Sequence, residues 1–402
     1  MGEAERYADY MYGLVDKAIR EIGPRESCSE AERRLGRLFA GEVEGACREV
    51  RFEEFTCSPN AFLGFFPFLV AGYLAALALY YVLPPLSLIV TAVCVGILYF
   101  EVVRYRELID FLFPRRKGEN VIGIVPPEGE TRKRFIVSAH LDSAYEFKVW
   151  YWLKGLAVPA MALAFTGPLV LLAASLARTL AGSTGIPDTT AFRVLGYVCM
   201  AFVPVILPFA LFHTRDVVPG AMDDMAGIGV LCGLARYLED SRQKGGFRPR
   251  QTEVVLLAMS AEEAGLRGAK RYAARHRQEL LSLPTYAVFL DGIYDERYLT
   301  AFKRELWCGA KMDPYLVELA REAALKNGYP VKVAVMPVGA TDGSAFARAG
   351  IPSVSICCQD TSRLVPHYHT RLDTVEKVRP ESLAVTLQVV MDMLQKIDGA
   401  GP

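Results

Sequence analysis

The sequence lacks an excess of charge of either sign, because its 402 residues include 45 basic and 45 acidic side chains. It also lacks a run of basic residues with interleaved aromatics, which is the pattern of a nucleic-acid-binding surface. No internal repeat and no low-complexity tract is present. These absences argue against a nucleic-acid partner, and the length predicts two or three folding units.

Cysteine pairs at metal-binding or redox spacing are absent as well. The nine cysteines are scattered, none belongs to a Cys-x-x-Cys pair, and Cys94 and Cys199 lie in apolar segments. An odd number of scattered cysteines does not suit a disulfide framework. We therefore expect reduced, mostly buried thiols.

Charge is missing altogether between Glu54 and Glu101. About twenty apolar residues cross the hydrocarbon core of a bilayer, and four segments of about this length occur in two pairs. Their ranges are 61–82, 86–100, 155–177 and about 194–212. We therefore expect two transmembrane helical hairpins. The alternative, buried core helices of a soluble protein, suits uncharged runs of this length poorly.

Basic residues predict the orientation of these spans. Nine precede the first pair and five lie in the segment 104–117, whereas the short links on the other side contain only Arg178 and, at a boundary, Arg193. By the positive-inside rule, both termini and the polar segments are expected on the cytoplasmic side. The stretch before the first span has the pattern of an amphipathic helix rather than a signal peptide.

Outside the spans, strand and helix patterns alternate, which predicts one three-layer α/β/α domain that is interrupted twice. We expect its parts at 1–58, 105–150 and 214–402, with the hairpins at 59–104 and 151–213. Predicted strands cover 50–55, two stretches within 120–142, 253–259, 286–290, 331–336 and 353–357. Predicted helices cover 3–22, a segment capped by Ser29, 226–238, 264–280, 314–327 and 380–397.

His140 and Asp142 end the apolar, β-branched run that begins at Arg134. In an extended segment, residues two apart point to the same side, and ligands gather at the carboxyl ends of strands in open α/β sheets. A neutral imidazole binds a metal through one nitrogen while a carboxylate holds the other. The alternative is a strand end with a hydrogen-bonded structural histidine.

Further acids and histidines follow predicted strands or lie in loops. Paired glutamates directly after a buried strand are unusual unless a cation meets them, whereas adjacent aspartates before a helix also suit capping. Nitrogen and oxygen ligands of this kind suit zinc, and a shared carboxylate can bridge two ions. The residues are Asp223, Asp224, Glu262, Glu263, Asp291, His367 and His369.

These motifs read His-x-Asp, Gly-Ala-x-Asp-Asp-x-Ala-Gly, Glu-Glu followed by Gly, Leu-Asp-Gly and His-Thr-x-x-Asp-Thr, in this order. In this the chain resembles the co-catalytic dizinc aminopeptidase family, which includes bacterial leucyl aminopeptidases and glutamate carboxypeptidase-like enzymes. The resemblance covers the polar parts of the chain but not the four spans. It implies a zinc-exopeptidase fold with a mixed sheet, two zinc ions (cobalt or manganese would fit the same ligands) and a peptide substrate.

The resemblance also implies roles. A water bridging the two ions would attack the scissile carbonyl, and Glu262 would be the general base that passes its proton to the leaving amine. Asp223 would bridge the ions, and Asp142 would orient its histidine. The other expected ligands are His140, Glu263, Asp291 and His369, with His367 as a competitor for the last position and Asp224 as a supporting acid.

One segment departs from the family. Thr341–Phe346 resembles a segment that lines the family's site and often contains Ser-Asp-His, but Gly343 stands in place of that histidine. The substrate contacts of this loop therefore stay open.

The sequence favours a membrane-bound zinc exopeptidase, with aminopeptidase activity ahead of carboxypeptidase activity. An inactive binding or scaffold relative and a glutaminyl-cyclase-like enzyme are the alternatives; a transporter is disfavoured because the central parts of the spans contain no charge. The second hairpin is inserted between His140 and Asp223, which predicts a site near the inner leaflet and hydrophobic or membrane-associated peptides. The oligomeric state is not predicted.

Overall fold

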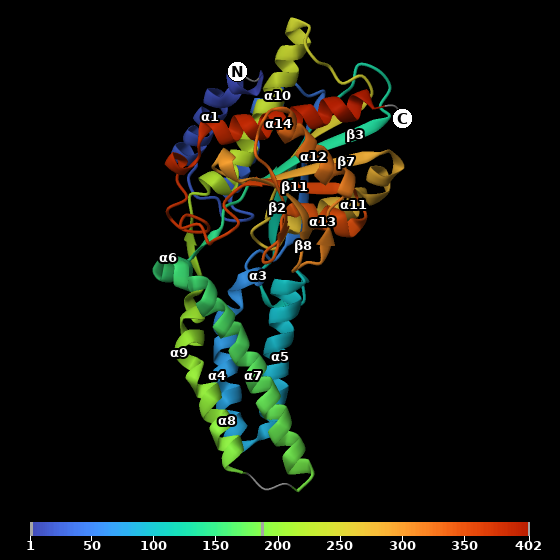
Figure 1. Cartoon of the computed structure of the whole chain (residues 1–402). Coiled ribbons are helices and arrows are strands. Elements are labelled where there is room, and N and C mark those ends of the chain that lie inside the picture. The colour runs from blue at the N-terminus through green and yellow to red at the C-terminus, as the bar shows by residue number, and fades with distance from the viewer. Residues whose placement is uncertain (1–2, 186–188, 401–402) are drawn as a thin grey trace. The chain divides into compact units, whose positions relative to one another are not determined.

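The computed structural model describes residues 3–185 and 189–400, and the chain divides into two compact units (Figure 1). The first unit combines Met1–Pro59, Arg115–Tyr145 and Val217–Pro402, and the second combines Asn60–Pro114 and Glu146–Asp216. Each unit is therefore assembled from parts that lie far apart in the sequence.

A mixed sheet of nine strands forms the centre of the first unit. Its order is β1-β2-β6-β3-β7-β11-β8-β10, and β9 pairs with β8. The neighbours β6, β3, β7 and β11 run parallel, whereas β1, β2 and β8 are joined to the sheet by antiparallel pairs. The strands are β1 (Glu49–Cys57), β2 (Arg116–Val125), β3 (Lys133–His140), β6 (Thr252–Met259), β7 (Thr285–Ile293), β8 (Leu299–Glu305), β9 (Ala310–Lys311), β10 (Lys332–Met336) and β11 (Ser353–Cys358).

Parallel pairing of the central strands brings the predicted ligand segments to one edge of the sheet. His140 is the last residue of β3 and pairs with Met259, the last residue of β6, and Asp291 lies near the end of β7. The carboxyl ends of parallel strands meet at the same edge. Residues that lie more than a hundred positions apart in the sequence therefore become neighbours.

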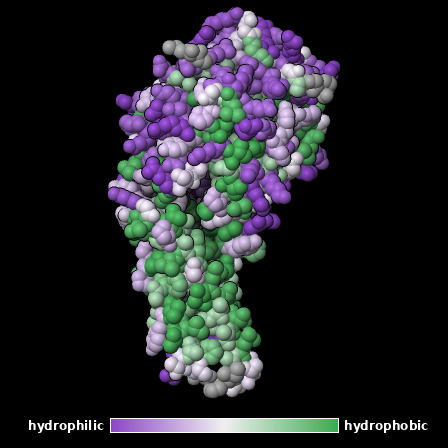
Figure 2. All heavy atoms as spheres, in the orientation of Figure 1, coloured by the Kyte–Doolittle hydropathy of each residue, from purple (hydrophilic) through white to green (hydrophobic). Residues whose placement is uncertain are grey.

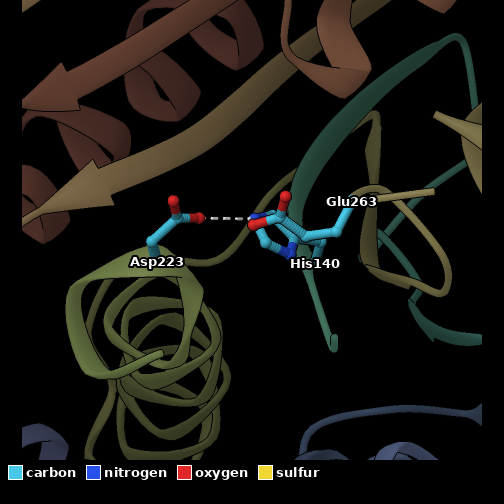
Figure 3. A group of neighbouring side chains, drawn as sticks. All are labelled: His140, Asp223 and Glu263. Carbon is cyan, nitrogen blue, oxygen red and sulfur yellow. Dashed lines mark hydrogen bonds and ion pairs between the residues drawn. The ribbon is translucent and has the colours of Figure 1, made fainter. Parts of the chain in front are cut away.

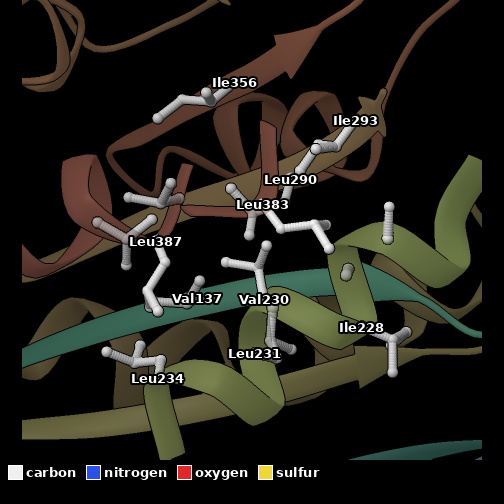
Figure 4. Close-up of a cluster of buried hydrophobic side chains, with 14 of the residues drawn as sticks. Val137, Ile228, Val230, Leu231, Leu234, Leu290, Ile293, Ile356, Leu383 and Leu387 are labelled. Carbon is white, nitrogen blue, oxygen red and sulfur yellow. The ribbon is translucent and has the colours of Figure 1, made fainter. Parts of the chain in front are cut away.

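Helices cover both faces of the sheet. Alternate residues of each strand point to opposite sides, so neighbouring residues of one strand belong to different cores. Val137 belongs to a core that includes α10 and α14 (Figure 4), whereas Ile136 belongs to a core with α11 and α13. The predicted three-layer arrangement is confirmed. The helices of this unit are α1 (Ala8–Glu21), α2 (Glu30–Val43), α10 (Ala226–Lys244), α11 (Arg267–Ser282), α12 (Pro314–Lys326), α13 (Asp342–Ala349) and α14 (Pro380–Gly399).

Among its described residues, the second unit contains four helical segments that are long and apolar enough to cross a membrane: Ala61–Val82, Pro84–Val103, Lys148–Ser183 and Thr190–Leu211. The third segment is helical to Ser183, so part of the expected polar link after residue 177 continues the helix. The elements are α3 (Ala61–Gly64), α4 (Phe66–Val82), α5 (Pro84–Leu98), α6 (Lys148–Leu153), α7 (Ala157–Ser183), α8 (Thr190–Ala201), α9 (Val203–Ile206) and the two-stranded pair of β4 (Tyr145–Phe147) and β5 (His213–Val217).

Large apolar side chains of these helices point outward (Figure 2). Phe68 is 70% exposed and Val82 is 82% exposed. Exposed apolar surface costs about 25 cal/mol per Å² in water, a cost that the acyl chains of a bilayer remove. The surface of this unit is thus suited to lipid.

Small residues and hydroxyl groups hold the helices of the second unit together. A side chain at Gly72 would collide with Cys94, and one at Gly167 would collide with Phe202, so these glycines permit close helix approach. Ser87 Oγ lies 2.9 Å from Ser175 Oγ, which joins α5 to α7. Packing of this kind is typical of membrane helix bundles.

Candidate metal centre

The ring of His140 is buried, and each of its nitrogens faces an acidic residue. Nδ1 lies 3.0 Å from the backbone oxygen of Asp142 and 3.4 Å from its Oδ1. Nε2 lies 3.0 Å from Asp223 Oδ1. The contacts of Nδ1 with Asp142 fix the orientation of the ring and leave Nε2 as the nitrogen that can bind a metal.

Asp223 lies between two histidines in the turn Ala221–Met225 before α10. Its Oδ1 faces His140, and its Oδ2 lies 3.2 Å from His369 Nε2. Burial opposes ionisation of this carboxyl, but the hydrogen bonds to both histidines hold the pKa of Asp223 below its ordinary value. One carboxylate therefore directs its two oxygens at two separate imidazoles.

Glu263 completes a group of potential metal ligands. One ligand atom from each of His140, Asp223 and Glu263 lies within 4.8 Å of the others (Figure 3). Glu263 Oε1 is also 3.3 Å from His369 Nε2, but within the described residues this buried oxygen forms no hydrogen bond. A buried carboxylate oxygen without a donor fits a bound cation.

Asp291 and Glu262 line a small pocket together with His140 and Asp342. Burial raises the pKa of Glu262, and burial with the charge of Asp223 raises the pKa of Asp291. Several buried carboxylates without a counter-charge are costly, and a divalent ion removes that cost. Imidazole nitrogens and carboxylate oxygens are ligands that zinc takes.

Asp142 has a larger role than the orientation of His140 that the sequence predicts. Its Oδ1 accepts a hydrogen bond from the backbone N–H of Glu262 at 3.1 Å, and its Oδ2 accepts one from that of Glu263 at 3.1 Å. Oδ2 also accepts a bond from Ser27 Oγ at 2.6 Å. Asp142 thus fixes both glutamates relative to the end of β3.

Asp373, which belongs to the His-Thr-x-x-Asp-Thr motif, holds the backbone of the turn that contains Asp223. It accepts hydrogen bonds from the backbone N–H of Met222 at 2.8 Å and of Asp223 at 3.3 Å. Burial raises the pKa of Asp373 to about 8. The motif itself was the only sequence signal for this residue.

Arg25 is a fully buried cation for which the sequence predicted no role. Its guanidinium donates to the backbone oxygens of Leu141 at 2.9 Å and of Gly220 at 2.8 Å, and also to those of Gly23 and Pro219. Burial lowers the pKa of Arg25 to about 10, so it is charged at neutral pH. It joins the end of β3 to the turn that contains Asp223.

Replacing Arg25 by Met is expected to lower the free energy of unfolding by about 3 kcal/mol, because buried backbone oxygens lose their donors. Thermal unfolding of the metal-free protein in detergent measures the change. Arg20→Met is the control, since Arg20 is 75% exposed, and a surface change of this kind stays within about 0.5 kcal/mol. Equal melting temperatures for the two variants would contradict the role of Arg25.

The two residues left ambiguous by the sequence occupy different surroundings. The ring of His367 packs edge-on against Tyr294 with ring centres 4.7 Å apart, and burial lowers its pKa to about 4. Asp224 accepts hydrogen bonds from the backbone N–H of His140 at 3.1 Å and of Gly227 at 3.2 Å. The structure brings His369, and not His367, to Asp223; the assignment of ligands stays a prediction.

A family model supports the relation to peptidases. The model described as "Peptidase family M28" matches residues 205–394, a range that includes Asp223, Glu262, Glu263, Asp291 and His369. The chain is similar to "Aminopeptidase YwaD" of Bacillus subtilis (strain 168), with 28% identity over 173 residues. This similarity covers 41% of the chain and 35% of that relative, so the chain spans about a third of the relative's length.

Solved structures with the same fold cover nearly the whole chain. A zinc aminopeptidase from Bacillus subtilis has a TM-score of 0.57 at 15% identity and covers 97% of this chain and 94% of that one. A Zn-dependent exopeptidase from Parabacteroides distasonis has a TM-score of 0.56 at 16% identity and covers 98% of both chains. Bacteroides thetaiotaomicron glutaminyl cyclase has a TM-score of 0.55 at 14% identity, with 96% and 97% covered.

Proposed function

We propose, from the match of residues 205–394 to the family model described as "Peptidase family M28", that this chain belongs to that family and is a zinc-dependent exopeptidase of the membrane that removes amino-terminal residues from peptides. The observation that carries the proposal is Asp223, whose two oxygens face the Nε2 atoms of His140 and His369. A carboxylate placed between two imidazoles in this way suits a bridge between two ions.

The ligand sets of the two proposed ions follow from the neighbours of each histidine. Glu263 Oε1 lies beside His369, whereas Asp291 lines the same pocket as His140. We assign Glu263 and His369 to one ion, Asp291 and His140 to the other, and Asp223 to both. When bound, zinc would polarise the scissile carbonyl and lower the pKa of a water molecule.

Glu262 is proposed as the general base. Its side chain lines the pocket beside His140, and burial raises the pKa of Glu262 above its ordinary value, the direction that suits a carboxyl which both accepts and returns a proton. It would take a proton from the attacking water and deliver it to the leaving amine nitrogen. Asp142 holds the backbone of Glu262 in place for this transfer.

We further propose that the four apolar helices span a bilayer and that the unit with the metal centre lies on the cytoplasmic side. The support is the length and apolar character of the helices, together with the basic residues that flank them on one side. Because the second hairpin is inserted between His140 and Asp223, peptides near the membrane surface, and hydrophobic ones, are the proposed substrates.

Removing the metal is expected to abolish hydrolysis in washed membranes that contain the chain. Treatment with a chelator should reduce cleavage of an aminoacyl substrate to background, and zinc should restore it, with about two equivalents bound to the purified protein.

The proposed cytoplasmic orientation is tested with sealed vesicles. Inside-out vesicles should cleave an impermeant peptide, whereas right-side-out vesicles should not.

Other results would redirect the assignment. One equivalent of zinc with cyclisation of amino-terminal glutamine would favour the glutaminyl-cyclase alternative, to which the fold is also similar. Release of carboxy-terminal residues would indicate a carboxypeptidase. Zinc binding without turnover of any peptide would favour a binding or scaffold relative.

A further inference from the structure

Asp342 has a buried carboxylate that no other group in the described residues satisfies. The residue is 5% exposed, and neither Oδ1 nor Oδ2 has a hydrogen-bond partner. It is the first residue of α13 and lines the pocket that also contains Glu262, Asp291 and His140. It therefore faces the proposed reaction site but belongs to neither proposed ligand set.

The backbone that carries Asp342 is held in place by a second buried acid, Glu305 of β8. Glu305 accepts hydrogen bonds from the backbone N–H of Thr341 at 2.9 Å and from Thr341 Oγ1 at 2.7 Å, and from Ser355 Oγ at 3.2 Å. Ser344 Oγ donates to it as well. The residues on both sides of Asp342 are thus fixed, while its own carboxylate is left unpaired.

Gly343 belongs to the same arrangement. A side chain at this position would collide with Ser355 Oγ and press on the ring of Phe289. The space that a side chain at position 343 would need is taken by the hydrogen bonds around Glu305. Thr341 and Asp342 of this turn both line the pocket, but the hydroxyl of Thr341 is bonded to Glu305, whereas both carboxylate oxygens of Asp342 lack a hydrogen-bond partner among the described residues.

The charges of the pocket lining indicate which kind of substrate group Asp342 can bind. Its ionisable lining residues are His140, Glu262, Asp291 and Asp342, so no lysine or arginine lines it. Burial raises the pKa of Asp342 to about 7, and His140 and, more weakly, Lys270 of α11, which does not line the pocket, oppose this only in part. Asp223, Glu263 and Asp291 are the carboxylates assigned to the proposed ions, so Asp342 would stay without a ligand role, and the lining offers it no lysine or arginine. A cationic group is attracted to this place, and a carboxylate is repelled.

We infer that Asp342 binds the free α-ammonium group of the substrate and thereby makes the site an aminopeptidase site. A primary ammonium offers the donors that both free oxygens of Asp342 lack, and its charge removes the cost of burying that carboxylate. The carboxylate end of a peptide, or an acetylated amino end, gains neither. This inference rests on the proposed function, because it names the end of the substrate that the site recognises.

The test measures binding rather than turnover. Leucinol has a free amine and no scissile bond, and N-acetyl-leucinol lacks only the free amine. Their dissociation constants for the zinc-loaded full chain in detergent are measured by calorimetry for wild type, Asp342→Asn and the exposed control Asp9→Asn. We expect Asp342→Asn to weaken leucinol binding by about 10–100-fold, as for the loss of a charged hydrogen bond, and to leave N-acetyl-leucinol binding and zinc content unchanged.

Two results would overturn the inference: leucinol binding within twofold of wild type, or equal weakening of both ligands, which indicates a structural role. Unchanged N-acetyl-leucinol binding and zinc content show that the variant is folded. Loss of leucinol binding in a chain that cleaves no peptide would support the ammonium site and contradict the proposed function. Cleavage of free-amine peptides with an unaltered free-amine preference in Asp342→Asn would contradict the ammonium site alone.

Discussion

Replacing Glu262 by Gln is expected to lower kcat for peptide hydrolysis by about 10²–10⁴-fold, the contribution of a general base, while the zinc content stays unchanged. Gln has nearly the same shape but cannot accept the proton of the attacking water. The ligand atoms grouped around Asp223 come from His140 and Glu263, not from Glu262. The hydrogen bond from the backbone of residue 262 to Asp142 does not depend on the side chain.

Initial rates with a free-amine dipeptide and metal analysis of the same samples check this prediction. Glu130→Gln is the matched control, because the Glu130 side chain is 78% exposed and lies outside the site. A loss of zinc in Glu262→Gln would make this residue a ligand. A rate within tenfold of wild type would assign the proton transfer to another group.

The strands around the site were predictable because they are buried on both faces. In β3, β6 and β7, apolar residues follow one another almost without interruption, as in other central parallel strands. β8 escaped prediction because it ends in Lys303, Arg304 and Glu305, two of them exposed, which weakens the apolar pattern. α13 escaped prediction because it is eight residues long and has a glycine, a poor helix former, at its second position.

The residue types that make up the centre were predictable, but the contacts that hold them were not. Acids and histidines just after apolar strands can be read from the sequence, and parallel pairing then brings them together. Arg25 donates to Leu141, 116 positions away, and Ser27 donates to Asp142, 115 positions away. No local pattern encodes such pairs, because each partner is chosen by the folded backbone. The buried acid Glu305 belongs to the same class.

The bridging role of Asp223 predicts unequal metal losses in two variants. Asp223→Ala is expected to lower the affinity for both ions, because each proposed ligand set loses an oxygen, so less than one equivalent of zinc should remain after dialysis. His369→Ala is expected to release one ion and to leave about one equivalent, since His140, Asp223 and Asp291 still form a three-ligand set. Both variants should lose activity by at least about 10²-fold, the cost of removing one element that stabilises the developing oxyanion.

His367→Ala is the matched control, because this ring lies two residues from His369 but packs on Tyr294. It should keep both ions, and metal analysis after dialysis against a zinc buffer compares the three variants with wild type. A loss of only one ion in Asp223→Ala would mean that this carboxylate serves a single ion. A loss of zinc in His367→Ala with retention in His369→Ala would exchange the two histidines. Because Asp223 faces both imidazoles, a bridging role predicts that its removal costs more metal than the removal of a histidine that it faces.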